Sequence, residues 1–101
     1  MDSLKSVISI LFLKRIRSKN IRYTFEAALQ QSAAYDGQKQ VGFCRFDVQD
    51  QTWTIFTTHV LDEYGGQGIA KKMVLLVEQE AQKQGVNLQS TCWYATKILK
   101  N

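Results

Sequence analysis

The chain has 101 residues, 45% of them hydrophobic, which fits one globular domain and excludes an intrinsically disordered chain. Its formal net charge is only +4, and its two cysteines and single histidine argue against a disulfide framework or a structural zinc site. Six basic residues lie between positions 5 and 22, so the remainder of the chain is close to neutral.

Residues 1–20 are predicted to form an N-terminal extension, helical or strand-like, before a domain at residues 21–101. Because the extension is basic, we expect a solvated face or a flexible arm, with a nucleic-acid or membrane-surface role as the alternative. Its apolar stretch, Val7–Leu13, is too short to span a bilayer and is followed by Lys14 and Arg15 rather than a small-residue cleavage site. We expect no secretory signal, and an organellar transit peptide stays open.

The first half of the domain is predicted to be an antiparallel meander of three strands. Apolar residues alternate from Ile21 to Leu29, which favours a strand, although the alanine-rich stretch 27–34 competes for helix. Asp36-Gly37 is a hairpin turn signal, and the return strand is predicted at 41–48. The run at 52–60, rich in Trp, Thr, Ile, Phe and Val, is the clearest strand.

The second half is predicted to be a helix followed by one more strand. Apolar residues at helical spacing indicate a helix from about Gln67 to Gln84, which Gly85 ends. Val86–Cys92 is predicted to be a strand, and a right-handed crossover places it parallel to the third strand. Residues 95–100 are expected to form a short helical turn. The fold class is therefore predicted to be α+β.

A glycine-rich junction separates the third strand from the helix. Gly65, Gly66 and Gly68 lie where the strand ends and the helix begins. Unpaired N–H groups and the positive end of a helix dipole make such a junction a site for a phosphate or pyrophosphate. The junction lacks the Gly-Lys-Ser/Thr of a Walker loop and the spacing of the dinucleotide fingerprint, and a plain tight turn is the alternative.

The stretch Tyr64–Ala70, after the strand end Thr57–Val60, resembles the acyl-CoA loop of the GNAT (Gcn5-related) N-acetyltransferase superfamily, whose signature is Arg/Gln-x-x-Gly-x-Gly/Ala. Gly68 and Ala70 fill the last two places, and Gly65 stands where the family has Arg or Gln. The resemblance implies a compact GNAT-like fold that binds acetyl-CoA. It also implies which backbone groups bind the cofactor: those of Gly66, Gln67, Gly68, Ile69 and Ala70 at the pyrophosphate, and those of Val60 and Leu61 at the thioester or pantetheine.

A second resemblance, carried by Thr91-Cys92-Trp93-Tyr94 and the following Ile-Leu-Lys, is to a small single-domain GNAT subgroup of about 100 residues with a cysteine after the last strand. The subgroup's strand reads His-Thr-Glu-Val where this chain has Thr-Thr-His-Val, so His59 is shifted by two positions and keeps the same strand face. The implied catalytic residues are Cys92, as acetyl acceptor or thioester neighbour, and His59, as general base. Plain packing of either residue is the alternative.

Further candidates lie near the same loop. Asp62 and Glu63 are alternative candidates for the general base, or they are acidic residues that only interact with the helix dipole. Tyr64 and Tyr94 are candidate proton donors for the departing thiolate, and Cys44 is expected to pack in the second strand.

We therefore predict a cytoplasmic, acetyl-CoA-dependent N-acetyltransferase that acts on an unidentified small-molecule or protein amine. The expected partners include no metal and no nucleic acid, and the chain is a monomer or homodimer. The alternatives are a CoA-binding module without catalysis and a small interaction protein with a basic N-terminal arm.

Overall fold

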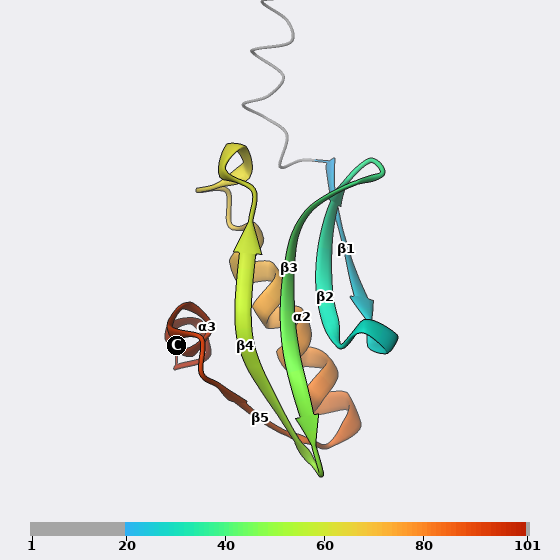
Figure 1. Ribbon diagram of the computed structural model, residues 1–101, viewed down its shortest axis with the longest axis vertical. Coiled ribbons are helices and arrows are strands. Elements are labelled where there is room, and N and C mark those ends of the chain that lie inside the picture. The colour runs from blue at the N-terminus through green and yellow to red at the C-terminus, as the bar shows by residue number, and fades with distance from the viewer. Residues whose placement is uncertain (1–19, 101) are drawn as a thin grey trace, which may run out of the picture.

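The computed structural model describes residues 20–100, which form a mixed five-stranded sheet with helices packed against it (Figure 1). The predicted extension lies outside the described residues apart from Asn20. The sheet order is β1-β2-β3-β4-β5, antiparallel as far as β4 and parallel between β4 and β5. The strands are Ile21–Glu26 (β1), Gln31–Asp36 (β2), Lys39–Gln49 (β3), Thr52–Val60 (β4) and Asn87–Ser90 (β5). The α+β class and the final parallel strand are confirmed.

The meander has four antiparallel strands instead of the predicted three. A 3-10 turn, Ala27–Leu29, and the left-handed Gln30 (φ 54°) divide the segment that was expected to be one strand or a helix. The helix propensity of the alanines is overridden by packing, because Ala33 and Ala34 are fully buried in the interior strand β2. The small side chains of Ser32 and Ala34 let the main helix approach, and the Ser32 hydroxyl donates a hydrogen bond to the Met73 carbonyl at 2.8 Å.

The main helix α2, Ile69–Gln84, covers one face of the sheet (Figure 1). Its buried stripe is Ile69, Met73, Val74, Val77 and Ala81. It begins two residues later than predicted because Gly68 is left-handed, and it ends at the predicted Gly85. No helix among residues 20–100 is long and apolar enough to cross a membrane.

The last strand is shorter, and the last helix is longer, than the sequence indicated. β5 stops at Ser90, and the second helix α3 runs over Trp93–Lys100. The Ser90 hydroxyl accepts a hydrogen bond from the Cys92 N–H at 3.1 Å and donates to the Cys92 carbonyl at 2.9 Å, which turns the chain out of the sheet. α3 contacts α2, β4 and β5, with Ala95 in the core.

A β-bulge in β4 determines which way its last side chains point. Arg45 pairs with Thr57 and Phe46 pairs with Ile55, which leaves Phe56 as an extra residue. An extra residue reverses the alternation of side chains. Ile55 faces α2 before the bulge, whereas Thr58 and Val60 face α2 after it. Thr57 and His59 consequently point to the opposite side, called here the open face. Pairing with β5 also stops at Ile55 and Ser90, so no strand within residues 20–100 pairs with the outer edge of the end of β4, called here the free edge.

Candidate active site

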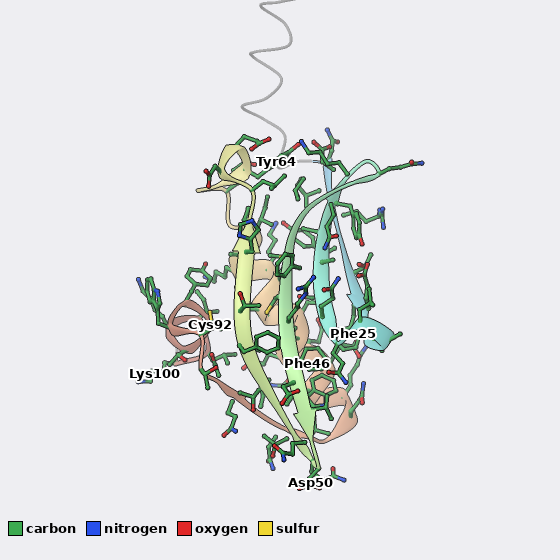
Figure 2. The ribbon with its side chains drawn as sticks, in the orientation of Figure 1. Phe25, Phe46, Asp50, Tyr64, Cys92 and Lys100 are labelled. Atoms are coloured by element: carbon green, nitrogen blue, oxygen red, sulfur yellow. The ribbon has the colours of Figure 1, made fainter. Side chains whose placement is uncertain are left out.

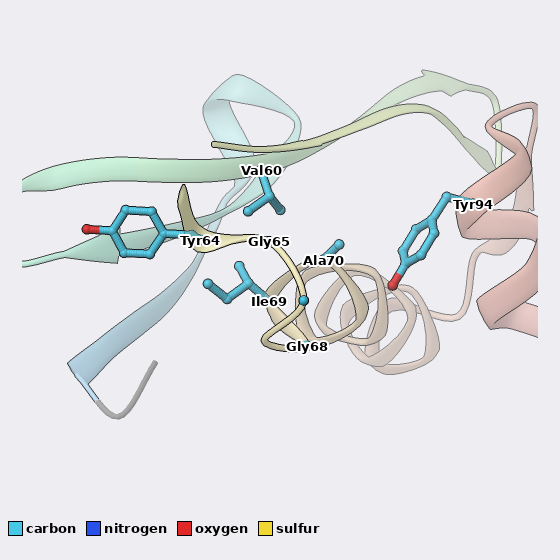
Figure 3. Close-up of a pocket in the computed structure, with 8 residues that line it drawn as sticks. Val60, Tyr64, Gly65, Gly68, Ile69, Ala70 and Tyr94 are labelled. Carbon is cyan, nitrogen blue, oxygen red and sulfur yellow. The ribbon is translucent and has the colours of Figure 1, made fainter. Parts of the chain in front are cut away.

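A pocket of about 290 Å³ lies where the free edge of β4 meets the glycine loop (Figure 3). It is bounded by the end of β4, the loop, the first turn of α2 and one side chain of α3. Its lining residues are Val60, Tyr64, Gly65, Gly66, Gly68, Ile69, Ala70 and Tyr94. Most of the residues predicted to bind the cofactor thus surround one cavity, whereas Leu61 and Gln67 are not among its lining residues.

The loop backbone forms an open cradle at the N-terminus of α2. Gly66 and Gly68 have φ angles of +74° and +81°, the left-handed region that side chains disfavour. A Cβ at either position would meet no atom of the described residues, 20–100, within 4 Å, so these residues leave the space above the loop open. The first N–H groups of α2 have no helical partner, and the helix dipole adds positive potential there. The geometry suits a bound anion.

Gly65 differs from its two neighbours because its backbone does not require glycine. Its φ and ψ are −68° and 156°, an extended conformation open to any residue. A Cβ would come within 3.3 Å of the Asp62 carbonyl, a close but adjustable contact. The fold therefore does not require glycine at position 65, and the absence of Arg or Gln there removes only the contacts that such a side chain would make.

The two predicted backbone donors at the end of β4 differ in availability. The Leu61 N–H donates to the Val41 carbonyl at 2.9 Å, so it is occupied within the sheet, contrary to our expectation. N–H groups alternate in direction along an antiparallel strand, so the Val60 N–H points away from β3, toward the free edge. Of the two predicted donors, Val60 is therefore the one whose N–H this edge leaves open to a ligand. The sequence could not distinguish the two because the distinction depends on strand pairing.

Gln67 presents an acceptor without a partner. Its side-chain oxygen is buried and has no hydrogen-bond partner among residues 20–100. Buried polar atoms in folded proteins are nearly always paired, so an orphaned one marks a place where a ligand or water completes the bonding. Only the backbone of Gln67 was predicted to take part, and no sequence signal pointed to its side chain.

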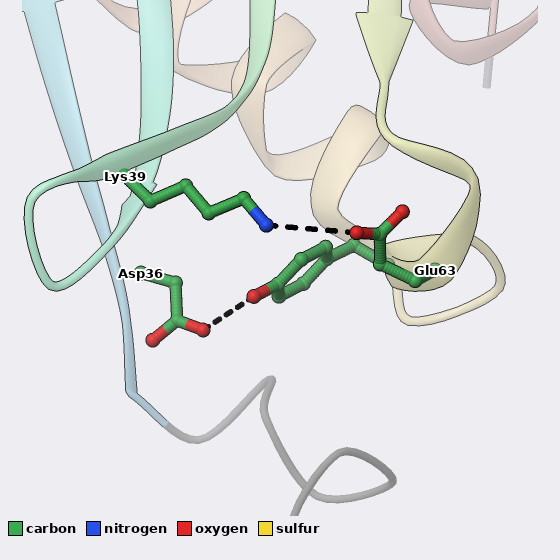
Figure 4. Close-up of polar contacts among 4 residues, drawn as sticks. Asp36, Lys39 and Glu63 are labelled. Carbon is green, nitrogen blue, oxygen red and sulfur yellow. Dashed lines mark hydrogen bonds and ion pairs between the residues drawn. The ribbon is translucent and has the colours of Figure 1, made fainter.

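The loop is tied to the β2–β3 hairpin through two polar contacts, called here the hairpin–loop contact (Figure 4). The hydroxyl of Tyr64, which is 6% exposed, donates to Asp36 Oδ2 at 2.5 Å. Lys39 Nζ lies 3.5 Å from Glu63 Oε2, with both side chains more than half exposed. These contacts span 24 to 28 positions in sequence, so sequence analysis assigned Asp36 only to a turn.

The hairpin–loop contact also distinguishes the two candidate proton donors, Tyr64 and Tyr94, by the direction of their hydroxyl groups. Tyr64 turns its hydroxyl away from the pocket and toward Asp36, so its ring borders the pocket and its hydroxyl does not (Figures 3 and 4). Tyr94 points its hydroxyl toward the first turn of α2 (Figure 3). Of the two tyrosines, Tyr94 is the one placed to donate a proton inside the pocket.

Cys92 lies between β5 and α3 (Figure 2), on the side of β4 that faces α2. Its Sγ is 3.7 Å from Thr58 Oγ1, which in turn contacts Cys44 Sγ at 3.6 Å. Cys44 is fully buried, as expected for a packing residue, and burial raises the pKa of its thiol to about 11. Cys92 is half-buried. The hydrogen-bond partners of its side chain and backbone N–H, Thr58 and Ser90, are not bases.

His59 points to the open face, away from Cys92. It is exposed, and its ring lies 5.5 Å from that of Phe43 across the β3–β4 pair. Thr58, the neighbour of Cys92, lies on the other face, so the two predicted catalytic residues do not form a pair. Asp62 and Glu63 begin a 3-10 turn, Asp62–Tyr64, where Glu63 is bound by Lys39. Residues 20–100 contain no group of His, Cys, Asp or Glu side chains that could hold a metal.

Comparison with known proteins provides a family match and fold neighbours. The model of the GCN5-related N-acetyl-transferase family matches residues 25–101. A comparison with curated proteins finds no match.

Three solved structures share the fold. A GCN5-related N-acetyltransferase from Sphaerobacter thermophilus superposes with TM-score 0.56 at 18% identity, over 77% of this chain and 24% of that one. The PaiA N-acetyltransferase from Thermoplasma acidophilum, in complex with coenzyme A, gives 0.52 at 19% identity, over 75% and 45%. An aminoglycoside acetyltransferase from an uncultured soil metagenomic sample, in complex with trehalose, gives 0.56 at 19% identity, over 95% and 77%. This chain therefore spans less than half the length of the first two.

Proposed function

The chain belongs to the GCN5-related N-acetyltransferase family, and on that basis we propose that it is an acetyl-CoA-dependent N-acetyltransferase. The observation that carries the proposal is the pocket between the glycine loop and the free edge of β4. It combines an anion site with a strand edge that is open for hydrogen bonding. The two free cysteines fit a reducing compartment, so we propose a cytoplasmic location.

The residues present fit acetyl-CoA. The left-handed Gly66 and Gly68 leave room for a pyrophosphate, and the N–H groups of Ile69 and Ala70 at the start of α2 are suited to bind it. The Val60 N–H at the free edge would hold the pantetheine or the thioester carbonyl. The unpartnered Gln67 oxygen would accept a hydrogen bond from the same ligand.

Catalysis would depend chiefly on positioning. Bound acetyl-CoA supplies a thioester whose carbonyl carbon is attacked by the amine nitrogen, so that a C–N bond forms and the C–S bond breaks. The Val60 N–H would polarise that carbonyl. His59, on the open face, would take the proton from the incoming ammonium. Tyr94, on the other side of β4, would donate a proton to the departing thiolate.

Direct transfer is favoured over a covalent cysteine intermediate. A thiol becomes a good nucleophile when a base or a cation stabilises its thiolate. Cys92 contacts Thr58 and Ser90, and His59 points to the opposite face. We propose that Cys92 lies beside the thioester without accepting the acetyl group. A mass gain of one acetyl group on Cys92 would contradict this assignment.

Calorimetric titration with acetyl-CoA and with CoA tests the cofactor site. We expect micromolar binding that Gly66→Ala weakens at least about tenfold, because a side chain at φ +74° strains the cradle. Gly85→Ala is the matched control: Gly85 has φ +69° and equally open surroundings, but it lies at the far end of α2. Absence of binding to folded protein at millimolar acetyl-CoA would refute the proposal. Thiol release with a panel of amines then tests turnover.

A further inference from the structure

The open face carries a cluster of three side chains beside the end of β4. The Phe43 ring contacts both the guanidinium of Arg45, whose Cζ lies 4.1 Å from the ring centroid, and the imidazole of His59, whose ring centroid lies 5.5 Å away. Phe43 pairs with His59, and Arg45 pairs with Thr57, so all of them project from neighbouring positions of β3 and β4. The proposed base and an arginine thus share one ring as their support.

The Arg45 side chain is held in place by a buried amide. Its Nε donates to Gln31 Oε1 at 3.0 Å, and Gln31 is only 4% exposed. The Gln31 amide nitrogen donates to Glu26 Oε1 at 2.8 Å, which fixes the orientation of the amide. Glu26 also accepts hydrogen bonds from Thr24 at 3.0 Å and Tyr35 at 2.6 Å. These bonds occupy the Glu26 carboxylate, so it orients Arg45 through Gln31 and does not neutralise it directly.

The terminal nitrogens of Arg45 remain available. No carboxylate within residues 20–100 forms an ion pair with this guanidinium, and only its Nε makes a hydrogen bond to another described residue. Arg45 is exposed, so its terminal N–H groups face solvent. A planar guanidinium held by stacking and one hydrogen bond is suited to bidentate recognition of a carboxylate.

The position of Arg45 relates it to the site of acetyl transfer. Its partner Thr57 begins the part of β4 that no longer pairs with β5. The guanidinium extends along β3 to lie over the ring of Phe43, the partner of His59. Neighbouring strands are about 4.8 Å apart, so the guanidinium lies one to two strand spacings, about 5–10 Å, across the sheet from the free edge near Val60. An amine at that edge with a carboxylate a few bonds away would reach both groups.

We propose that Arg45 binds a carboxylate of the acceptor, and therefore that the substrate is an amine of the amino-acid type. This inference rests on the proposed acetyltransferase function. A phosphate on the amine would offer the same kind of anion to Arg45. The fork of the guanidinium and the single positive charge favour a carboxylate, and the experiment separates the two.

The test compares acceptors that differ in the anionic group: β-alanine, propylamine and O-phosphoethanolamine. We expect β-alanine to have the highest kcat/KM. Arg45→Gln should lower kcat/KM for β-alanine at least about tenfold, mainly through KM, and leave that for propylamine unchanged. Arg45→Lys should restore part of the loss. For each variant, kcat/KM for β-alanine is divided by kcat/KM for propylamine. The two amines have different pKa values, but this difference is the same for every variant and cancels when the ratios are compared.

Arg22→Gln is the matched control. Arg22 also stacks on an aromatic ring of this face, that of Tyr35 at 4.8 Å, and donates to a backbone carbonyl at 3.3 Å. It lies on β1, three strands from the free edge. Its replacement should leave the β-alanine-to-propylamine ratio unchanged. An equal loss in both arginine variants would indicate a general charge effect and overturn the inference.

A binding measurement separates this inference from the proposed function. With CoA present, calorimetry should detect N-acetyl-β-alanine bound to the natural protein and at least about tenfold weaker binding to Arg45→Gln. If CoA does not bind, the proposed function fails. If CoA binds and amines are acetylated, but β-alanine has no advantage or O-phosphoethanolamine is preferred, only the carboxylate assignment fails.

Discussion

Replacement of Tyr64 by Phe should weaken acetyl-CoA binding without unfolding the domain. The change removes one hydroxyl, which donates to Asp36 at 2.5 Å, and retains the buried ring. A hydrogen bond to a charged group is worth about 1.5–3 kcal/mol, and the lower part applies because water can reach the half-buried Asp36 carboxylate. We therefore expect a loss of about 1–2 kcal/mol. If the ligand must then order the loop, the Kd rises about 5–30-fold.

Tyr35→Phe provides a matched control for this effect. The Tyr35 hydroxyl also donates to a carboxylate, that of Glu26, at 2.6 Å, but it does not border the pocket. Both variants should lose stability in urea denaturation, whereas only Tyr64→Phe should weaken CoA binding in calorimetry. Equal Kd values for Tyr64→Phe and the natural protein would refute the idea that the hairpin–loop contact orders the binding loop. Equal weakening in both variants would refute it as well.

Three further predictions concern single positions. Gly65→Gln should lower the Kd for CoA several-fold in calorimetry, because the extended backbone accepts a side chain that can contact the ligand. A higher Kd would mean that the close Asp62 carbonyl disturbs the loop. Gly42→Ala should destabilise the domain by about 1–3 kcal/mol in urea, since its Cβ would lie 2.9 Å from the His59 carbonyl and 3.0 Å from Met73 Cε. The Cys44 pKa of about 11 predicts that stability falls as pH rises from the unfolded thiol pKa, about 8.5, toward 11, because only the unfolded thiol ionises there. Cys44→Ala should flatten that part of the pH–stability curve, and an unchanged slope would contradict the assignment.

The parts of the fold that local chemistry determines were predictable. The α2 helix and its Gly85 stop follow from apolar spacing and a left-handed glycine. The hairpin at Asp36-Gly37 and the left-handed glycines of the loop Gly65–Gly68 follow from glycine positions in the same way. Each of these elements is encoded within a few consecutive residues.

The missed features depend on pairing between distant residues. The split into β1 and β2 was hidden because alanines favour a helix, whereas Ala33 and Ala34 are buried within the sheet. The engagement of Leu61 N–H by Val41 depends on strand register. The Tyr64–Asp36 bond and the Arg45–Gln31 bond join residues 28 and 14 positions apart. No periodicity or short motif carries such information.

Because Phe56 is an extra residue in β4, the site should be more sensitive to its deletion than to its replacement by another residue. Phe56 is 51% exposed, so many substitutions there should be accepted. Its deletion would restore regular alternation and exchange the faces of the last four residues of β4. His59 would then turn toward α2, and Thr58 would lose its place between the two thiols. Whether the number of residues from Ile55 to Val60 is even or odd therefore decides which side chains face α2 and which lie on the open face.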